Sequence, residues 1–193
     1  MNCRPFPRFP VAKHFAGEFV RNSRNGRTRF LSAPKRHTMP MAYILTTILL
    51  WTAFALAVPF RHWRRYYPAL IFTALLGTVC DLLGVVFDQW VYYGPVVGAL
   101  SLWSDLGIAP AEGGLFVRFF PASANRAVRF GYLLAWSLVN AGFEWFFVWV
   151  GWIGYDHWNP GRAFLFYIGF FGLIWAQEYW YNGTGRLRPV RKR

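Results

Sequence analysis

The sequence is poor in charged residues and in cysteine, and it lacks the motifs of soluble enzymes. Only 15% of its 193 residues are charged, against about 25% in an average soluble domain. Its two cysteines, Cys3 near the N-terminus and Cys80 within an apolar run, provide no disulfide framework. G-x-S-x-G, H-E-x-x-H, Walker and C-x-x-C motifs are absent, and the four histidines are too scattered for a metal cluster. These absences exclude an ordinary cytosolic enzyme.

Apolar and aromatic residues are in excess, and the net charge of +13 is concentrated near the N-terminus. Hydrophobic residues make up 55% of the chain and aromatic residues 21%. Residues 1–38 carry nine Lys or Arg and one acid, and they show no helical apolar stripe. This basic leader has three interpretations: an organellar transit segment, a basic arm for nucleic acid or anionic lipid, or a stretch left untranslated because initiation occurs at Met39 or Met41. We favour the late start.

Long apolar runs predict an all-α integral membrane bundle of about five transmembrane helices in a domain covering residues 39–182. Four of the spans are continuous, at residues 41–60, 68–87, 130–150 and 163–181. The third, between residues 91 and 120, is predicted to be discontinuous. Its central stretch SDLGIAPAE contains Asp105, Pro110 and Glu112, and neither flanking apolar piece is long enough to cross a bilayer.

The distribution of basic residues predicts the orientation of these spans. The connection after each successive span contains three, none, three and one basic residues, and the tail at residues 183–193 contains five. This alternation is typical of a bundle in which every second connection is cytoplasmic. We therefore expect a bacterial plasma membrane location, with the N-terminus outside and the basic tail in the cytoplasm. A leader with nine basic residues opposes that orientation, which is the reason for favouring the late start.

Carboxylates at membrane depth are the main candidates for a site. An unpaired charge there costs about 2.5 to 3.5 kcal/mol, so such residues usually face the bundle interior. Helical spacing places small and polar residues on single faces, in three stripes: Thr73, Gly77, Asp81, Gly84 and Asp88; Ser137, Asn140 and Glu144; and Gly169, Gly172 and Ala176. The candidate intramembrane polar site comprises Asp81, Asp105, Glu112, Asn140 and Glu144. It either carries protons, a cation or a substrate, or holds the helices together by hydrogen bonds.

Two functions fit these features. The first is a non-enzymatic membrane protein: a translocator of a small solute or ion, or a subunit of a membrane complex. The alternative is a membrane-embedded enzyme acting on a lipid head group, with Asp105, Glu112 or Glu144 as acid or base and arginines of residues 118–129 binding the head group. The sequence favours the first. No catalytic residue, metal site or cofactor is predicted, and the expected partners are the lipid bilayer and another membrane protein or a second copy, not nucleic acid.

Residues 67–182 resemble an uncharacterised family of small bacterial polytopic membrane proteins. The resemblance rests on Asp81 in the second span, the aromatic cluster WVYYGP, the interrupted SDLGIAP segment, Glu144 in the fourth span, and GWIGYDHWN before the last. It implies a multi-span fold and a membrane location, and it implies no chemistry. The long leader departs from the short N-terminus usual in that family.

Overall fold

The computed structural model describes residues 39–92 and 103–182. These residues form α1 (Met39–Ala57), η1 (Phe60–His62), α2 (Trp63–Val86), β1 (Trp90–Tyr92), η2 (Trp103–Ile108), α3 (Ala109–Phe119), α4 (Arg126–Trp149), β2 (Ile153–Tyr155) and α5 (Pro160–Asn182). The prediction of a mainly α-helical protein is confirmed. The predicted leader at residues 1–38 and the tail at residues 183–193 lie outside the described residues.

Side-chain caps and a proline set where α4 and α5 begin. Asn125 precedes α4, and its Oδ1 accepts a hydrogen bond from the Val128 backbone N–H at 2.9 Å. Asn159 does the same before α5, accepting from the Arg162 N–H at 3.0 Å, and Pro160 occupies the first helical position. A cap of this kind satisfies a backbone N–H that has no partner within the helix, and proline lacks that N–H.

Helices α2 and α4 end in the same way, and each turns directly into a strand. Asp88 follows α2 with a φ of 51°, and Gly151 follows α4 with a φ of 80°. After the first turn the Gln89 N–H bonds to the Gly84 carbonyl at 2.8 Å, and an equivalent bond closes α4. A left-handed residue just past a helix reverses the chain in this manner. The two strands then pair antiparallel as a short β-ribbon, β1–β2.

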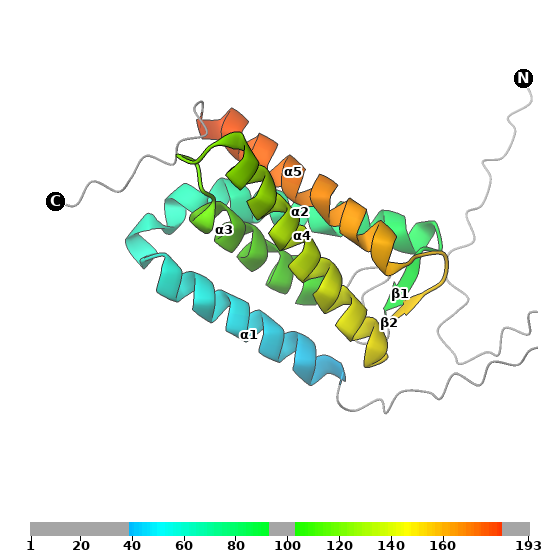
Figure 1. The fold of residues 1–193 in the computed structure, drawn as a ribbon. Coiled ribbons are helices and arrows are strands. Elements are labelled where there is room, and N and C mark those ends of the chain that lie inside the picture. The colour runs from blue at the N-terminus through cyan, green and yellow to red at the C-terminus, as the bar shows by residue number, and fades with distance from the viewer. Residues whose placement is uncertain (1–38, 93–102, 183–193) are drawn as a thin grey trace, which may run out of the picture. The chain divides into compact units, whose positions relative to one another are not determined.

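The helices pack lengthwise with the β-ribbon at one end, as Figure 1 shows. Helix α4 lies beside α5, α2 packs on α3 and α5, and α1 packs on η2 and α3. Helix α3 is buried along most of its length. The core is aromatic, and its fully buried side chains include Phe54 of α1, Phe116 of α3 and Phe171 of α5.

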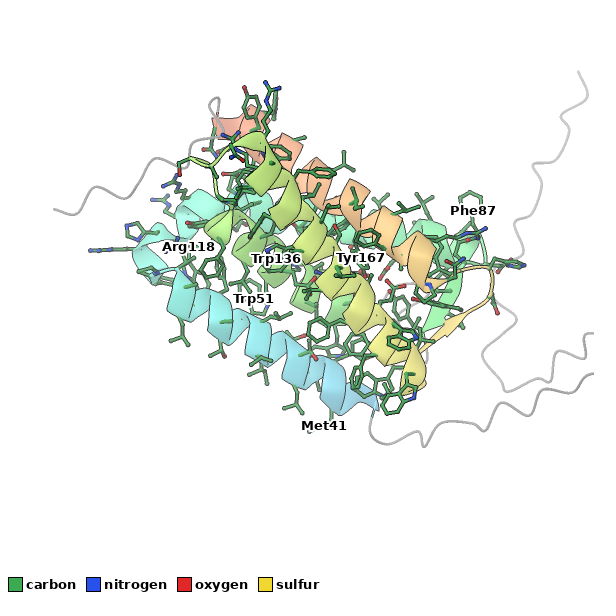
Figure 2. The ribbon with its side chains drawn as sticks, in the orientation of Figure 1. Met41, Trp51, Phe87, Arg118, Trp136 and Tyr167 are labelled. Atoms are coloured by element: carbon green, nitrogen blue, oxygen red, sulfur yellow. The ribbon has the colours of Figure 1, made fainter. Side chains whose placement is uncertain are left out.

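The two ends of the bundle differ in charge. The Arg118 Nε–H donates to the Ala57 carbonyl at 3.0 Å, so the connection between α1 and α2 adjoins the one between α3 and α4. These two connections contain or border Arg61, Arg64, Arg65, Arg118, Arg126 and Arg129. At the other end the Asp156 N–H donates to the Gln89 carbonyl at 3.1 Å, which places the connections bearing Asp88 and Asp156 together. Figure 2 shows Arg118 and Phe87 at these opposite ends.

The predicted break in the third segment is wrong for the described part of that segment. Residues 103–119 are helical throughout: η2 is π-helical and runs directly into α3. Pro110 lies in the first turn of α3, directly after the π-helical turn. The described part of the segment therefore has no non-helical middle, although its first six residues are π-helical.

Length and hydropathy identify fewer membrane spans than the sequence pattern predicts. In the described residues one helix, Phe60–Val86, is long and apolar enough to cross a membrane, and Tyr43–Ala57 is a shorter apolar helix. A single helix of this kind is weak evidence by itself. The five-span arrangement therefore remains a proposal, to which we return below.

Small residues allow α3 to pack closely on α2, whereas those of α5 have no such role. A Cβ on Gly113 would overlap the side chain of Thr73, so only glycine permits this approach. A Cβ on Gly169 or on Gly172 would meet nothing within 4 Å. The spacing of small residues on the last span also suggests a close-packing face, and that prediction is wrong at Gly169 and Gly172 within this chain.

Candidate functional site

The polar stripes predicted on the second and fourth spans are the inward faces of α2 and α4. Thr73, Gly77, Asp81 and Gly84 are all buried, whereas Asp88 lies past the end of α2 and is exposed. In α4, Ser137 and Asn140 are buried and Glu144 is half-buried. Helical periodicity had placed these residues on common faces, and tertiary packing turns both faces toward the interior.

All five candidate site residues line one cavity of about 100 Å³ near the β-ribbon. Asp81 comes from α2, Asp105 from η2, Glu112 from α3, and Asn140 and Glu144 from α4. The free thiol of Cys80 also lines it. Sequence analysis groups Asp105 and Glu112 with Glu144 only because all three are expected at membrane depth, since separation along the chain says nothing about distance in space. The function of the cavity is not shown by this geometry alone and is proposed below.

Glu144 is held by three hydrogen bonds. Its Oε1 accepts from the Tyr155 hydroxyl at 2.6 Å and from the Trp158 Nε1–H at 3.0 Å. Its Oε2 accepts from the Tyr167 hydroxyl at 2.8 Å. The three donors come from β2, from the connection that follows it, and from α5. Glu144 therefore joins α4 to β2, to the connection after β2 and to α5.

Asp81 and Asp105 form a carboxyl pair that is only partly satisfied. The Tyr92 hydroxyl donates to Asp81 Oδ1 at 2.8 Å. The Asp81 and Asp105 side chains lie beside each other. Oδ2 of each aspartate is buried with no hydrogen-bond partner among the described residues. These two oxygens are available to a ligand.

Each strand of the β-ribbon supplies one tyrosine hydroxyl that donates to a cavity carboxylate. Tyr92 of β1 reaches Asp81, and Tyr155 of β2 reaches Glu144. Burial, with the adjacent carboxylate, raises the pKa of each hydroxyl, so both remain protonated donors at neutral pH. Sequence reasoning missed both tyrosines and Tyr167. The available signal was an aromatic segment containing tyrosine directly after each helix that carries a polar stripe.

Within the described part of the chain, no positive side chain balances these acids in the cavity. Lys, Arg and His do not occur among the described residues that line it. Across residues 39–92 and 103–182, no group of three or more His, Cys, Asp or Glu is arranged to hold a metal ion. The chemistry offered is that of carboxylates, hydroxyls and aromatic rings.

The arginines that the lipid-enzyme alternative assigns to a head group lie away from the cavity. Arg118 donates to the Ala57 carbonyl, and Arg129 Nε–H donates to the Ala124 carbonyl at 2.9 Å. Neither lines the cavity, which lies toward the other end of the bundle. Carboxylates and arginines therefore do not form one site.

A seventh acid of the described chain, Glu178, occupies a separate environment. It is buried in α5 beside Phe116, Trp175 and Asn182, and the Asn182 side chain donates to it. It does not line the carboxylate cavity. This residue provides a natural control for experiments on the other acids.

The fold and the site together define an α-helical protein in which four buried or half-buried carboxylates line one small cavity. Comparison with protein-family models, with curated proteins and with solved structures finds no match for the chain. Function must therefore be argued from the geometry of the cavity.

Proposed function

We propose that the protein is an integral membrane protein whose helical bundle binds a small cation and passes it across the bilayer. One observation carries the proposal: Asp81, Asp105, Glu112 and Glu144 line a single cavity with no basic residue among its described lining. Carboxylates grouped without a counter-charge attract a cation and repel an anion. Ionisable residues inside a membrane bundle most often mark the path of an ion or substrate.

The outer surface of the helices supports a membrane location. Large apolar side chains are exposed along all the long helices, including Leu56 of α1 at 83%, Leu75 of α2 at 61%, Leu138 of α4 at 64% and Trp180 of α5 at 81%. Soluble monomers rarely expose apolar patches beyond a few hundred Å². In a bilayer, lipid chains would cover this apolar surface, so it would not be exposed to water.

A polar inner face and an apolar outer face explain why α4 is not among the helices identified as membrane spans by mean hydropathy. Its polar residues Ser137 and Asn140 are turned inward, while Leu138 and Val139 face outward. An average over the whole helix mixes the two faces, so it understates how apolar the outer face is. At 24 residues, α4 is about 36 Å long, which exceeds the hydrocarbon thickness of about 30 Å.

The charge difference between the two ends supports the proposed orientation. The arginine-bearing connections lie together at one end, which we assign to the cytoplasm under the positive-inside rule. The end with Asp88 and Asp156 is then outside. The cavity lies nearer this outer end, where a cation from outside would first meet the carboxylates.

The lipid-head-group enzyme is the less favoured interpretation. The cavity carboxylates would suit a general acid or base. A phosphate head group, however, would face four carboxylates without an arginine to bind it. We therefore favour cation passage over catalysis.

Flux through reconstituted vesicles tests the proposal. Full-length protein in lipid vesicles should take up Na⁺, K⁺ or radiolabelled methylammonium faster than protein-free vesicles do. Asp81→Asn should reduce that uptake at least about ten-fold, because it removes a charge from the cavity. Glu178→Gln, which changes a buried acid outside the cavity, is the matched control and should leave uptake unchanged. Uptake equal to that of protein-free vesicles for all three cations would overturn the proposal.

A further inference from the structure

We infer that the cavity binds a small protonated amine of about four or five non-hydrogen atoms. This inference rests on the proposed function in taking the cavity as a cation site, and it names the chemical class of the cation. The volume of about 100 Å³ corresponds to roughly three water molecules at about 30 Å³ each. That space suits an alkylammonium or a small amino alcohol.

Unpartnered polar atoms show that the cavity is built for a ligand. Asp105 is 2% exposed, Asp81 9% and Tyr43 4%, and each has an oxygen without a hydrogen-bond partner among the described residues. All three residues line the same cavity. Buried polar atoms are normally paired, because leaving one unpaired costs about 1 to 3 kcal/mol. These three oxygens are acceptors, and an ammonium group carries up to three N–H donors.

Aromatic rings complete the environment for an organic cation. Trp90, Phe166 and Phe170 line the cavity and pack against one another, with ring centroids 6.3 Å apart for Trp90 and Phe166 and 5.9 Å apart for Phe166 and Phe170. Ring faces attract cations and also contact the alkyl part of an amine. The buried Trp90 Nε1–H lacks a partner as well, and a hydroxyl on the ligand or a water molecule would accept from it.

The side chains that line the cavity argue against a metal ion, or a proton alone, as its occupant. A metal ion needs several oxygen, nitrogen or sulfur ligands at short distance, and the described residues include no group of three His, Cys, Asp or Glu so arranged. A proton needs no cavity and makes no use of aromatic walls. A small amine uses the acceptors and the rings together.

Titration calorimetry on the full chain in detergent, with methylammonium, ethanolammonium, tetramethylammonium and Na⁺ chlorides, tests the inference. Methylammonium and ethanolammonium should bind at least ten-fold more tightly than Na⁺. They should also bind more tightly than tetramethylammonium, which has no N–H to donate. Asp105→Asn should weaken methylammonium binding at least about ten-fold, as expected for a lost charge-assisted hydrogen bond. Glu178→Gln should bind like the unmodified protein.

Tyr43→Phe keeps the ring and removes only the hydroxyl, so it tests the site even if Asp105→Asn fails to fold. We expect it to weaken methylammonium binding several-fold without changing the thermal unfolding midpoint. Equal binding of methylammonium by the unmodified protein, Asp105→Asn and Tyr43→Phe would overturn the inference. Na⁺ binding as tight as methylammonium would also overturn it, yet would leave the proposed cation passage standing. If neither cation binding nor vesicle flux is observed, both the proposed cation passage and the inferred amine site are overturned.

An ammonium group occurs both in free amines and in the ethanolamine head group of lipids. Repeating the methylammonium titration in nanodiscs of phosphatidylglycerol alone, and in nanodiscs that also contain phosphatidylethanolamine, separates these sources. Weaker methylammonium binding in the second set identifies a lipid amine as the occupant. Unchanged affinity identifies a free amine, which the four carboxylates favour because they would repel a lipid phosphate.

Discussion

At the residue scale, Glu144 and Asp81 occupy the same cavity but differ in how their oxygens are used. Both oxygens of Glu144 accept hydrogen bonds, three in all. Asp81 accepts from Tyr92 through one oxygen and leaves the other without a partner. Glu144 is therefore placed to hold the surrounding segments in position, while Asp81 and Asp105 retain acceptors for a ligand.

This difference predicts contrasting effects of substituting Glu144. Glu144→Leu removes both acceptor oxygens and with them three hydrogen bonds, so it should destabilise the protein by about 2 kcal/mol, at about 0.6 kcal/mol for each hydrogen bond in a membrane protein. Glu144→Gln keeps one carbonyl oxygen for Tyr155 and Trp158, and its amide can donate to the Tyr167 hydroxyl, so the loss should stay below about 1 kcal/mol. Thermal unfolding in detergent measures both. Equal destabilisation by Leu and Gln would show that the charge, not the hydrogen bonding, holds these segments.

At the scale of elements, the contact between α2 and α3 sets the position of the carboxylates. Asp81 lies two turns after Thr73, and Glu112 adjoins Gly113, the residue on which Thr73 packs. A change in the distance between these helices would therefore move Asp81 relative to Glu112 and Asp105.

We expect Gly113→Ala to destabilise the protein by about 1 to 3 kcal/mol, the usual cost of inserting an atom into a packed contact. The control is Gly142→Ala in α4, where the added Cβ meets nothing within 4 Å. It should be neutral or stabilising by up to about 1 kcal/mol, because alanine favours a helix more than glycine does. Thr73→Ala added to Gly113→Ala removes the overlapping Oγ1 and Cγ2 and should recover part of the loss. Equal thermal stability of the two glycine variants would refute this account of the contact.

At the scale of the whole molecule, the separation of charge between the two ends predicts membrane topology. Reporter fusions placed after Arg65 and after Arg129 should both indicate the cytoplasm, because these arginine-bearing connections adjoin. Fusions near Tyr92 and near Asp156 should indicate the outside. If the fusions at Tyr92 and Arg129 report the same side, the third segment does not cross, and four spans remain.

Periodicity and composition were sufficient to predict several parts of this protein. The apolar runs predicted the mainly helical fold, with helix bounds within a few residues of those observed for α1, α2, α4 and α5. The spacing of Thr73, Gly77 and Asp81 placed these residues on one face, because a helix returns to the same side every three or four residues. Each of these inferences depends on neighbours along the chain, which is why the sequence alone supports them.

Only the tertiary structure decided what surrounds the carboxylates. The packing of η2 and α3 against α1 and α2 places Asp105 beside Asp81, and helix formation at Pro110 removed the break that composition had indicated. The pairing of β1 with β2 brings Tyr92 to Asp81 and Tyr155 to Glu144. These contacts join residues far apart in the chain, and they depend on which helices pack together and at what distance. A local sequence pattern carries no information about either, so the cavity emerges only from the folded chain.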